Sequence, residues 1–138
     1  MAENIKIKYL IIGGGVAGTT AAETLRQNDP DGSIAIVSDE PYPFYSRIML
    51  SKPNFFLGKL PFENIFLKKE NWYQEHNINF IGGISANNLD PQKKTVSLSD
   101  GQNIEYEKLL LAIGGCARRW QIKGSDKKGI CYLRTLDE

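Results

Sequence analysis

The sequence predicts an α/β fold in which a parallel sheet is extended by an antiparallel β-meander. An apolar strand at Ile5–Ile12, a helix at Val16–Gln27 and a branched strand at Ile34–Ser38 follow one another. Strand, helix and strand within roughly thirty residues are typical of a right-handed parallel βαβ unit. Later in the chain, short strands are separated by Asp90-Pro91 and Asp100-Gly101, which are the turn signals of a meander.

The composition of each element supports the βαβ unit. Ile5–Ile12 ends in apolar residues without alternation, as expected of a strand buried on both faces of a parallel sheet. Ala17, Ala21 and Leu25 give the helix a face of small side chains that can lie close to the sheet. The turn residues of Asn28–Gly32 then end the helix.

After the second strand the pattern changes. Several prolines break Glu40–Glu63 into short helical or irregular pieces. The remaining expected elements are a helix at Leu67–His76 and strands at Ile78–Ile81, Ile84–Leu89, Thr95–Leu98, Asn103–Tyr106 and Leu109–Ile113.

Composition excludes several functional classes. The chain has 138 residues and a net charge of +1, which suits one domain and gives no electrostatic reason to expect nucleic acid or a membrane as partner. Cys116 and Cys131 do not make a disulfide framework, and we expect them to be buried packing residues or incidental thiols. With His76 as the one histidine, we predict no metal site and no catalytic side chain, and we expect a cytoplasmic location.

A glycine motif lies between the first strand and the first helix. Gly13, Gly15 and Gly18 fit G-x-G-x-x-G. The first glycine permits the tight turn, the second lets a pyrophosphate approach the backbone, and the third lets the helix pack on the strand. The N–H groups and helix dipole at Val16 and Ala17 favour the phosphates. The motif predicts a Rossmann-like dinucleotide-binding fold; a glycine turn of purely structural use is the alternative.

The identity of the dinucleotide depends partly on the end of the second strand. The motif expects an acidic residue about 20 positions further on, where it binds a ribose hydroxyl. Asp39 and Glu40 stand there, and either could serve. Because an acidic group repels a 2′-phosphate, the pattern favours FAD or NAD over NADP and does not separate those two.

Further segments resemble one family. "GGGVAG", "DEPYPFYSRIMLSK" (Asp39–Lys52), "YEKLLLAIGG" (Tyr106–Gly115) and "GICYLRTLDE" occur in this order. Together they resemble the FAD-dependent pyridine nucleotide-disulfide oxidoreductase family. Within it they are most similar to the ferredoxin and rubredoxin reductases, apoptosis-inducing factor and the nitrite reductase large subunit. The resemblance implies FAD as the cofactor.

The resemblance also assigns roles to residues. Gly13–Ala17 would hold the FAD pyrophosphate, and Asp39 or Glu40 the adenosine ribose. Arg47 would reach the adenosine or pyrophosphate end, with an ordinary surface ion pair to Asp39 or Glu40 as the alternative. The full set of predicted FAD-binding residues is Gly13, Gly14, Gly15, Val16, Ala17, Gly18, Asp39, Glu40, Arg47, Lys52, Ala86, Ala112 and Gly114.

The more distant members of that set are assigned in the same way. Lys52 would lie near the flavin ring, or it faces solvent. The backbone around Ala86 would meet the adenine. Ala112 and Gly114 fall where the family has A-T-G, with Ile113 in place of the threonine.

The missing thiols narrow the implied activity. Thiol-dependent members of the family place cysteine in the stretch after the tyrosine, which here is Ser46–Met49 and has none. The resemblance therefore implies electron transfer from NAD(P)H through FAD to a redox protein or a haem or iron–sulfur centre, without a redox-active disulfide. The alternatives are the NAD-binding domain of a dehydrogenase and a non-catalytic nucleotide-binding fragment.

The extent of the chain limits what it can do alone. We expect residues 1–115 to be the amino-terminal part of an FAD-binding domain and residues 116–138 to be a linker toward an NAD-binding domain that this sequence lacks. The full-length protein would be an oxidoreductase with NAD(P)H and a redox partner, and the fragment alone would be inactive. The incomplete FAD/NAD(P)-binding domain leaves an open sheet edge, through which the chain could form a homo-oligomer.

Overall fold

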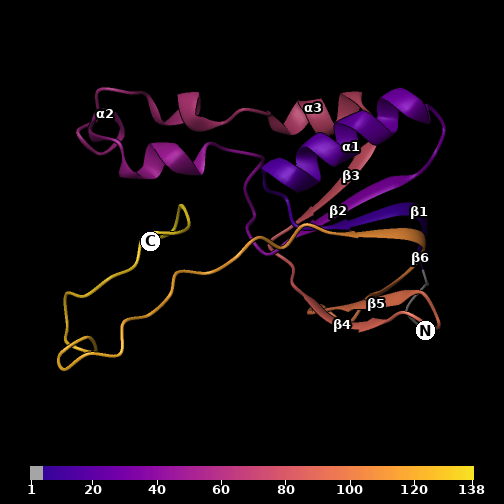
Figure 1. Cartoon of the computed structure of the whole chain (residues 1–138). Coiled ribbons are helices and arrows are strands. Elements are labelled where there is room, and N and C mark those ends of the chain that lie inside the picture. Colours follow the sequence, from indigo (N-terminus) through magenta and orange to yellow (C-terminus); the bar gives the residue numbers. More distant parts are fainter. Residues whose placement is uncertain (1–4) are drawn as a thin grey trace.

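The computed structural model describes residues 5–138 and contains one six-stranded mixed sheet with the strand order β3-β2-β1-β6-β5-β4 (Figure 1). This confirms the predicted α/β fold, with a Rossmann-like parallel part and an antiparallel meander. The strands are β1 (Ile5–Ile12), β2 (Ile34–Ser38), β3 (Ile78–Gly82), β4 (Ala86–Asp90), β5 (Thr95–Leu98) and β6 (Asn103–Leu111). The helices are α1 (Val16–Asn28), η1 (Arg47–Ser51), α2 (Pro53–Phe56), η2 (Phe62–Ile65) and α3 (Glu70–Glu75).

The parallel part of the sheet consists of β3, β2, β1 and β6. The register brings Ile12 opposite both Val37 and Leu111, so β1, β2 and β6 end at one edge of the sheet. In open parallel sheets, ligands bind outside the carboxyl ends of the strands. The fold therefore points to this edge as the place for a site.

Each face of the parallel sheet packs against a different layer. In β2, Ile34 and Ile36 belong to the cluster that α1 and α3 cover, whereas Ala35 and Val37 belong to the cluster shared with β5. Figure 1 shows the helices above the sheet and the meander below it. All five residues of β2 are buried, which explains its unbroken apolar composition.

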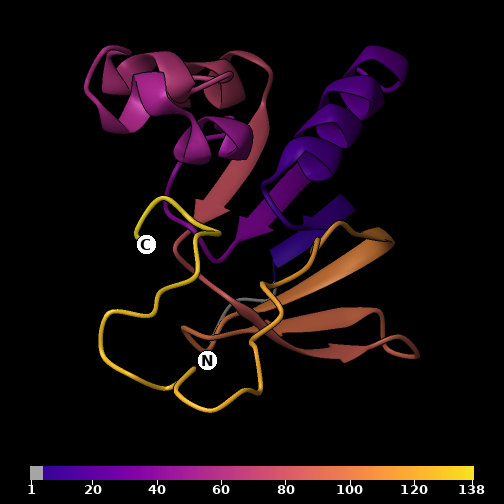
Figure 2. The same ribbon diagram turned by 60° about the vertical axis from the view of Figure 1, so that its left-hand side comes forward.

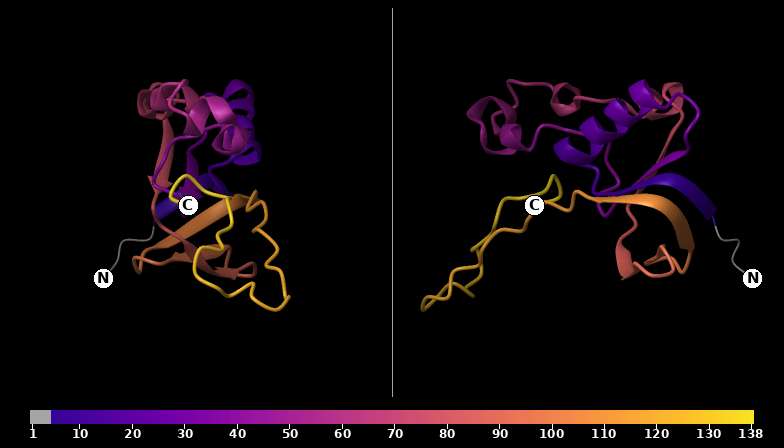
Figure 3. Two further views of the ribbon diagram at one scale, coloured as in Figure 1. Left: turned by 90° about the vertical axis from the view of Figure 1, so that its left-hand side faces the viewer. Right: turned by 45° about the vertical axis from the view of Figure 1, so that its right-hand side comes forward.

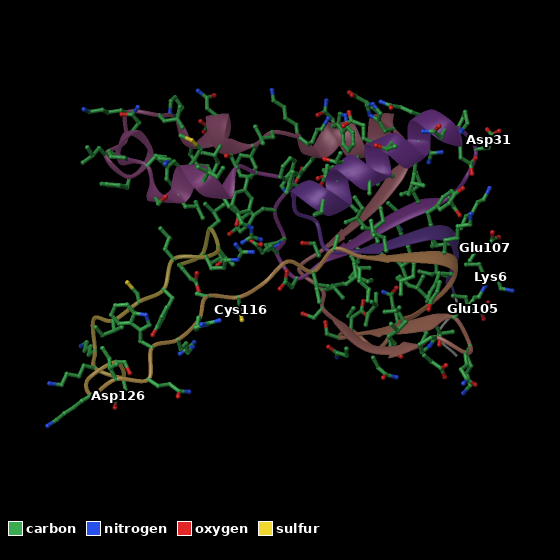
Figure 4. All side chains as sticks on the ribbon, viewed as in Figure 1. Lys6, Asp31, Glu105, Glu107, Cys116 and Asp126 are labelled. Carbon is green, nitrogen blue, oxygen red and sulfur yellow. The ribbon has the colours of Figure 1, made fainter. Side chains whose placement is uncertain are left out.

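Two sequence predictions about the strands differ from the structure. The strand predicted at Ile84–Leu89 begins two residues later, as β4 at Ala86–Asp90. Asn103–Tyr106 and Leu109–Ile113, predicted as two strands, form the single strand β6, which ends at Leu111. Glu107 and Lys108 interrupt the apolar pattern, but the backbone continues because β6 pairs with β1 along its length. The amino-terminal half of β6 also pairs antiparallel with β5. The Lys6–Glu105 ion pair, at 3.3 Å, lies at that end of the sheet (Figure 4).

The segment between β2 and β3 folds beside the sheet as short helices. The predicted helix at Leu67–His76 is shorter and comprises only Glu70–Glu75. Tyr45, Leu50 and Ile65 form a small separate core in this segment. No helix in residues 5–138 is long and apolar enough to cross a membrane.

Residues 112–138 form neither helix nor strand. After β6 this segment extends away from the sheet and then returns toward the segment that follows β2 (Figures 2 and 3). Three hydrogen bonds fix the return: Arg47 donates to the carbonyl oxygen of Arg134, the N–H of Leu136 donates to the hydroxyl of Tyr45, and the hydroxyl of Tyr42 donates to the carboxylate of Asp137.

Candidate functional site

A cleft of about 590 Å³ lies at the carboxyl ends of the parallel strands. This volume falls within the range of small-molecule and cofactor sites. Its walls come from the glycine loop, the end of β2, the segment after β2, the end of β6, and residues 112–138, called the tail below, which return to the cleft at Arg134. The lining residues are Gly13, Gly14, Gly15, Val16, Ala17, Ser38, Asp39, Glu40, Tyr42, Pro43, Phe44, Tyr45, Ser46, Arg47, Ile48, Leu67, Leu111, Ala112, Ile113, Gly114 and Arg134.

The protein itself requires two glycines of the loop. Gly13 has φ +117°, and a Cβ there would lie 2.2 Å from the carbonyl oxygen of Ala112. A Cβ on Gly18 would lie 1.9 Å from the carbonyl oxygen of Gly13. Both contacts are with backbone, so neither can be relieved by turning a side chain. Gly13 thus permits the turn, and Gly18 permits α1 to approach the loop.

Gly15 differs from these two glycines. Its backbone has φ −77° and ψ −166°, an extended conformation open to any residue. A Cβ there would meet no atom within 4 Å. Neither the backbone nor the packing therefore requires glycine at this position. The remaining reason for a glycine here is the cleft: without a side chain at position 15, a ligand can lie close to the main chain.

The first turn of α1 offers donors to this space. Gly15 is the N-cap residue and makes no side-chain capping hydrogen bond. The first N–H groups of a helix have no partner within the helix, and the dipole gives them partial positive charge. Val16 and Ala17 are exposed and line the cleft. The loop is therefore suited to bind an anion such as a pyrophosphate.

The two acidic residues after β2 have different surroundings. Asp39 is exposed at the cleft, and no side chain in residues 5–138 pairs with its carboxylate. Glu40 is buried, and both of its oxygens are engaged, one by Arg47 and the other by the hydroxyl of Tyr45. Asp39 is therefore the carboxylate that remains open to a ligand hydroxyl.

Arg47 is held by contacts within the chain. One terminal nitrogen donates to Glu40 and the other to the carbonyl oxygen of Arg134, at 2.7 Å. The guanidinium carbon also lies 5.5 Å from the ring centroid of Tyr45. Of the alternatives for Arg47, the ion pair with Glu40 is present, although it is a half-buried pair and not a surface one.

Burial and its bond to Glu40 raise the pKa of Tyr45 above that of an ordinary phenol. The hydroxyl therefore stays protonated and can donate to the carboxylate at all physiological pH values.

Most predicted site residues line the cleft, and three do not. Gly18 packs behind the loop. Lys52 is an exposed residue at the start of α2, away from the lining. Ala86 begins β4; the bend before it lies beside β2, where the N–H of Ile84 donates to the carbonyl of Ser38 at 3.0 Å. The roles assigned to Lys52 near a flavin and to Ala86 near an adenine stay predictions.

Arg134 is a charged residue of the cleft that lies outside the predicted set. It lines the cleft, and one of its terminal nitrogens is 3.3 Å from the position that a Cβ on Gly114 would occupy. It therefore brings a cation to the end of β6. Its signal in the sequence is the "LRT" of "GICYLRTLDE", a segment whose pattern predicts only a link to a further domain.

The two cysteines are both free and exposed. The alternative that they are buried packing residues is therefore wrong, because both lie in the irregular tail (Cys116 is labelled in Figure 4). Neither lines the cleft. In residues 5–138, no group of three or more His, Cys, Asp or Glu side chains could hold a metal ion.

The fold and the cleft define an α/β domain that binds a dinucleotide at a strand-to-helix turn. The model of the family described as pyridine nucleotide-disulphide oxidoreductase matches residues 7–138, and the chain belongs to this family. This confirms the resemblance seen in the sequence. Members of the family are FAD-binding flavoproteins, which confirms FAD as the cofactor at the level of the family.

The chain is similar to several reductases. It is 38% identical over 129 residues to a rubredoxin-NAD(+) reductase of Pseudomonas putida, covering 94% of this chain and 33% of the relative. It is 35% identical over 142 residues to the peroxisomal monodehydroascorbate reductase 4 of Arabidopsis thaliana, covering 93% and 29%. The solved ferredoxin reductase of the CYP199A2 system of Rhodopseudomonas palustris matches with a TM-score of 0.85 and 33% identity, covering 98% and 32%. The chain thus spans about a third of the length of these relatives.

Proposed function

We propose that this chain is the FAD-binding portion of an NAD(P)H-dependent flavoprotein oxidoreductase that passes electrons to a redox protein or a haem or iron–sulfur centre. The observation that carries the proposal is Gly15, a glycine that the protein's own packing does not require, at the mouth of an amide-lined cleft. Membership of the family supports FAD as the ligand of that cleft.

The residues present fit the pyrophosphate and the adenosine ribose of a dinucleotide. The N–H groups of Val16 and Ala17 would bind the pyrophosphate, and Arg134, which lines the same cleft beside Gly114, would add positive charge. Asp39 would accept hydrogen bonds from the adenosine ribose, because Glu40 is already engaged. FAD, when bound, supplies the hydride and single-electron chemistry, and the protein supplies its position and electrostatic surroundings.

Electron transfer is favoured over thiol chemistry. A thiol relay needs an accessible sulfur close to the flavin, and neither Cys116 nor Cys131 lines the cleft. The relatives are named for rubredoxin, ferredoxin and monodehydroascorbate as redox partners or substrates. A redox protein as acceptor and NAD(P)H as donor are therefore proposed for the reaction to which this chain contributes its FAD site.

The test is a serine at position 15. Serine is a better N-cap than glycine, so Gly15→Ser should leave the free energy of unfolding of the free protein unchanged or raise it by a few tenths of a kcal/mol. Its side chain would occupy the cleft and compete for the N–H groups. The affinity for FAD, measured by titration with flavin fluorescence, should fall about tenfold or more, which corresponds to ~1.4 kcal/mol.

Titration with NAD separates the alternatives. Binding of NAD with no binding of FAD would favour a plain dehydrogenase domain, and binding of neither would refute the proposed function. Equal FAD affinity in the wild type and Gly15→Ser would show that the loop does not hold the cofactor.

We propose three further properties of the chain. The division into an FAD-binding part, residues 1–115, and a linker, residues 116–138, is supported by the end of regular structure at β6. A cytoplasmic location is supported by the two free exposed thiols, which suit a reducing compartment. A homo-oligomer is supported by the unpaired outer edge of β6 at residues 108–111, beyond its pairing with β5.

A further inference from the structure

The tail of the chain contributes to the cleft at both of its ends. Ala112 and Gly114, where the tail begins, line the cleft, and so does Arg134, where the tail returns. The residues between them have no helix or strand to hold them. Figure 2 shows the tail extending away and coming back. Something other than regular structure must therefore keep Arg134 in place.

Three hydrogen bonds hold the returning end. The side chain of Arg47 donates to the carbonyl oxygen of Arg134 at 2.7 Å, and the N–H of Leu136 donates to the hydroxyl of Tyr45 at 3.1 Å. The hydroxyl of Tyr42 donates to the carboxylate of Asp137 at 2.5 Å. Leu136 also packs against the small core formed around Tyr45.

Glu40 fixes the two side chains, Arg47 and Tyr45, that make two of these three hydrogen bonds. One carboxylate oxygen accepts from Arg47 and the other from the hydroxyl of Tyr45. Because the Tyr45 hydroxyl gives its proton to Glu40, its oxygen is free to accept the N–H of Leu136. One terminal nitrogen of the Arg47 guanidinium is fixed on Glu40. Because the group is planar and rigid, the other terminal nitrogen faces the carbonyl oxygen of Arg134.

We propose that Glu40, Tyr45 and Arg47 form a latch that positions Arg134 at the phosphate end of the cleft, so that Glu40 is a positioning residue and not the ribose ligand. The inference rests on the proposed function, because the charge of Arg134 is useful there only if a dinucleotide binds. Glu40 is buried, and its two oxygens point to the latch. Asp39, next to it, is exposed at the cleft.

The latch has a measurable consequence for the bound cofactor. A segment that is ordered before binding loses less conformational entropy when the ligand arrives. Loss of the latch should therefore free the Arg134–Leu136 segment in the free protein and speed the release of FAD.

The direct test is Tyr45→Phe, which removes the hydroxyl and keeps the buried ring. The amide of Leu136 should exchange its hydrogen about tenfold faster, as expected for loss of a hydrogen bond of ~1.4 kcal/mol. FAD should dissociate severalfold faster in stopped-flow flavin fluorescence. The control is Tyr9→Phe, which removes a tyrosine–carboxylate bond to Asp29 at the opposite end of α1 from the glycine loop and should change neither rate.

A second pair of variants separates positioning from direct contact. Glu40→Gln should speed both Leu136 exchange and FAD release. Asp39→Asn should weaken FAD binding and leave Leu136 exchange unchanged. If Glu40→Gln weakens FAD binding without any change in Leu136 exchange, Glu40 touches the cofactor and the proposal is wrong.

Three other outcomes would show whether the latch exists and whether it serves the cofactor. Unchanged Leu136 exchange in Tyr45→Phe would mean that no latch exists. Faster exchange with unchanged FAD release would mean that the latch does not serve the cofactor. If the wild type binds no FAD at all, the proposed function fails, the role of the latch toward the cofactor fails with it, and the exchange data still report whether the latch holds the tail.

Discussion

Gly13, Gly15 and Gly18 belong to one motif but are required for different reasons. Gly13 needs its positive φ, and Gly18 needs room for the carbonyl of Gly13. Neither the backbone conformation nor the packing requires glycine at position 15, so room for a ligand is the remaining explanation for this glycine. The motif in the sequence predicts all three positions. Only the structure separates the two that fold the loop from the one that serves the cleft.

The first residue-scale prediction concerns Gly18→Ala. The new Cβ would lie 1.9 Å from the carbonyl oxygen of Gly13, so α1 must shift away from the loop. We expect the free energy of unfolding, measured with urea, to fall by about 3 kcal/mol or more. The control is Gly115→Ala, where a Cβ meets no atom within 4 Å. Equal stability of the two variants would contradict the close packing of α1.

The second residue-scale prediction concerns pH. Asp29 accepts from the amine of Lys8 at 2.6 Å and from the hydroxyl of Tyr9 at 2.9 Å. The bond from Lys8, and then the bond from Tyr9, lower the pKa of Asp29 from 3.8 to about 2. The folded state therefore binds this proton more weakly than the unfolded state does. The stabilisation by Asp29 is complete above the unfolded pKa and is lost as the pH falls through the folded one.

Thermal unfolding of the wild type and Asp29→Asn across this pH range is the measurement. The wild type should be more stable above pH 3.8, and the difference should shrink as the pH falls toward 2. A difference that does not change with pH would show that the carboxylate charge has no role in this contact.

At the scale of elements, α1 is joined to the end of α3 by one side chain. Arg26, in the last turn of α1, donates to the carbonyl oxygens of His76 and Asn77, both at 2.8 Å. It also donates to the carbonyls of Asp29 and Pro30, at 3.1 Å and 2.6 Å. A planar guanidinium can reach several acceptors at once, whereas an ammonium cannot do so in this geometry.

Arg26→Lys tests this connection between elements. The charge near the carboxyl end of α1 is kept and the fork is lost, so we expect the free energy of unfolding to fall by about 2 kcal/mol. Urea unfolding measures the change, with Arg118→Lys in the exposed tail as the matched control. If the lysine variant is as stable as the wild type, the four bonds contribute through charge alone.

Local sequence patterns delimit some elements of the sheet and not others. β1, β2 and β5 were predicted with the observed bounds, because apolar runs and turn signals delimit them locally. The sequence predicts two strands in place of β6, because the charged Glu107 and Lys108 interrupt the apolar pattern. The strand is nevertheless continuous, because β6 pairs with β1, which is distant in the sequence. The same holds in the site. The glycine loop is local and predictable, whereas Glu40 pairing with Arg47 and Arg134 reaching the cleft depend on tertiary contacts.

At the scale of the whole molecule, the sheet is covered unevenly. Its faces are packed by helices and by the meander, but the outer edge of β6 at residues 108–111 pairs with no strand in residues 5–138. Beside that edge, a second cleft lies between α1 and β6, lined largely by apolar side chains. Leu110 and Leu111 are 40% and 55% exposed there. An unprotected apolar edge favours pairing with another strand.

The final prediction is that this chain self-associates through β6 and that a charge on the edge prevents it. Sedimentation of the wild type should show association that increases with concentration. Leu110→Lys should weaken it about tenfold or more, since lysine on an edge strand opposes pairing. Leu57→Lys is the matched control, because Leu57 is 60% exposed at the end of α2, far from this edge. If the wild type stays monomeric throughout, or both variants weaken association equally, β6 is not the contact between copies, and the exposed leucines of its edge have another role.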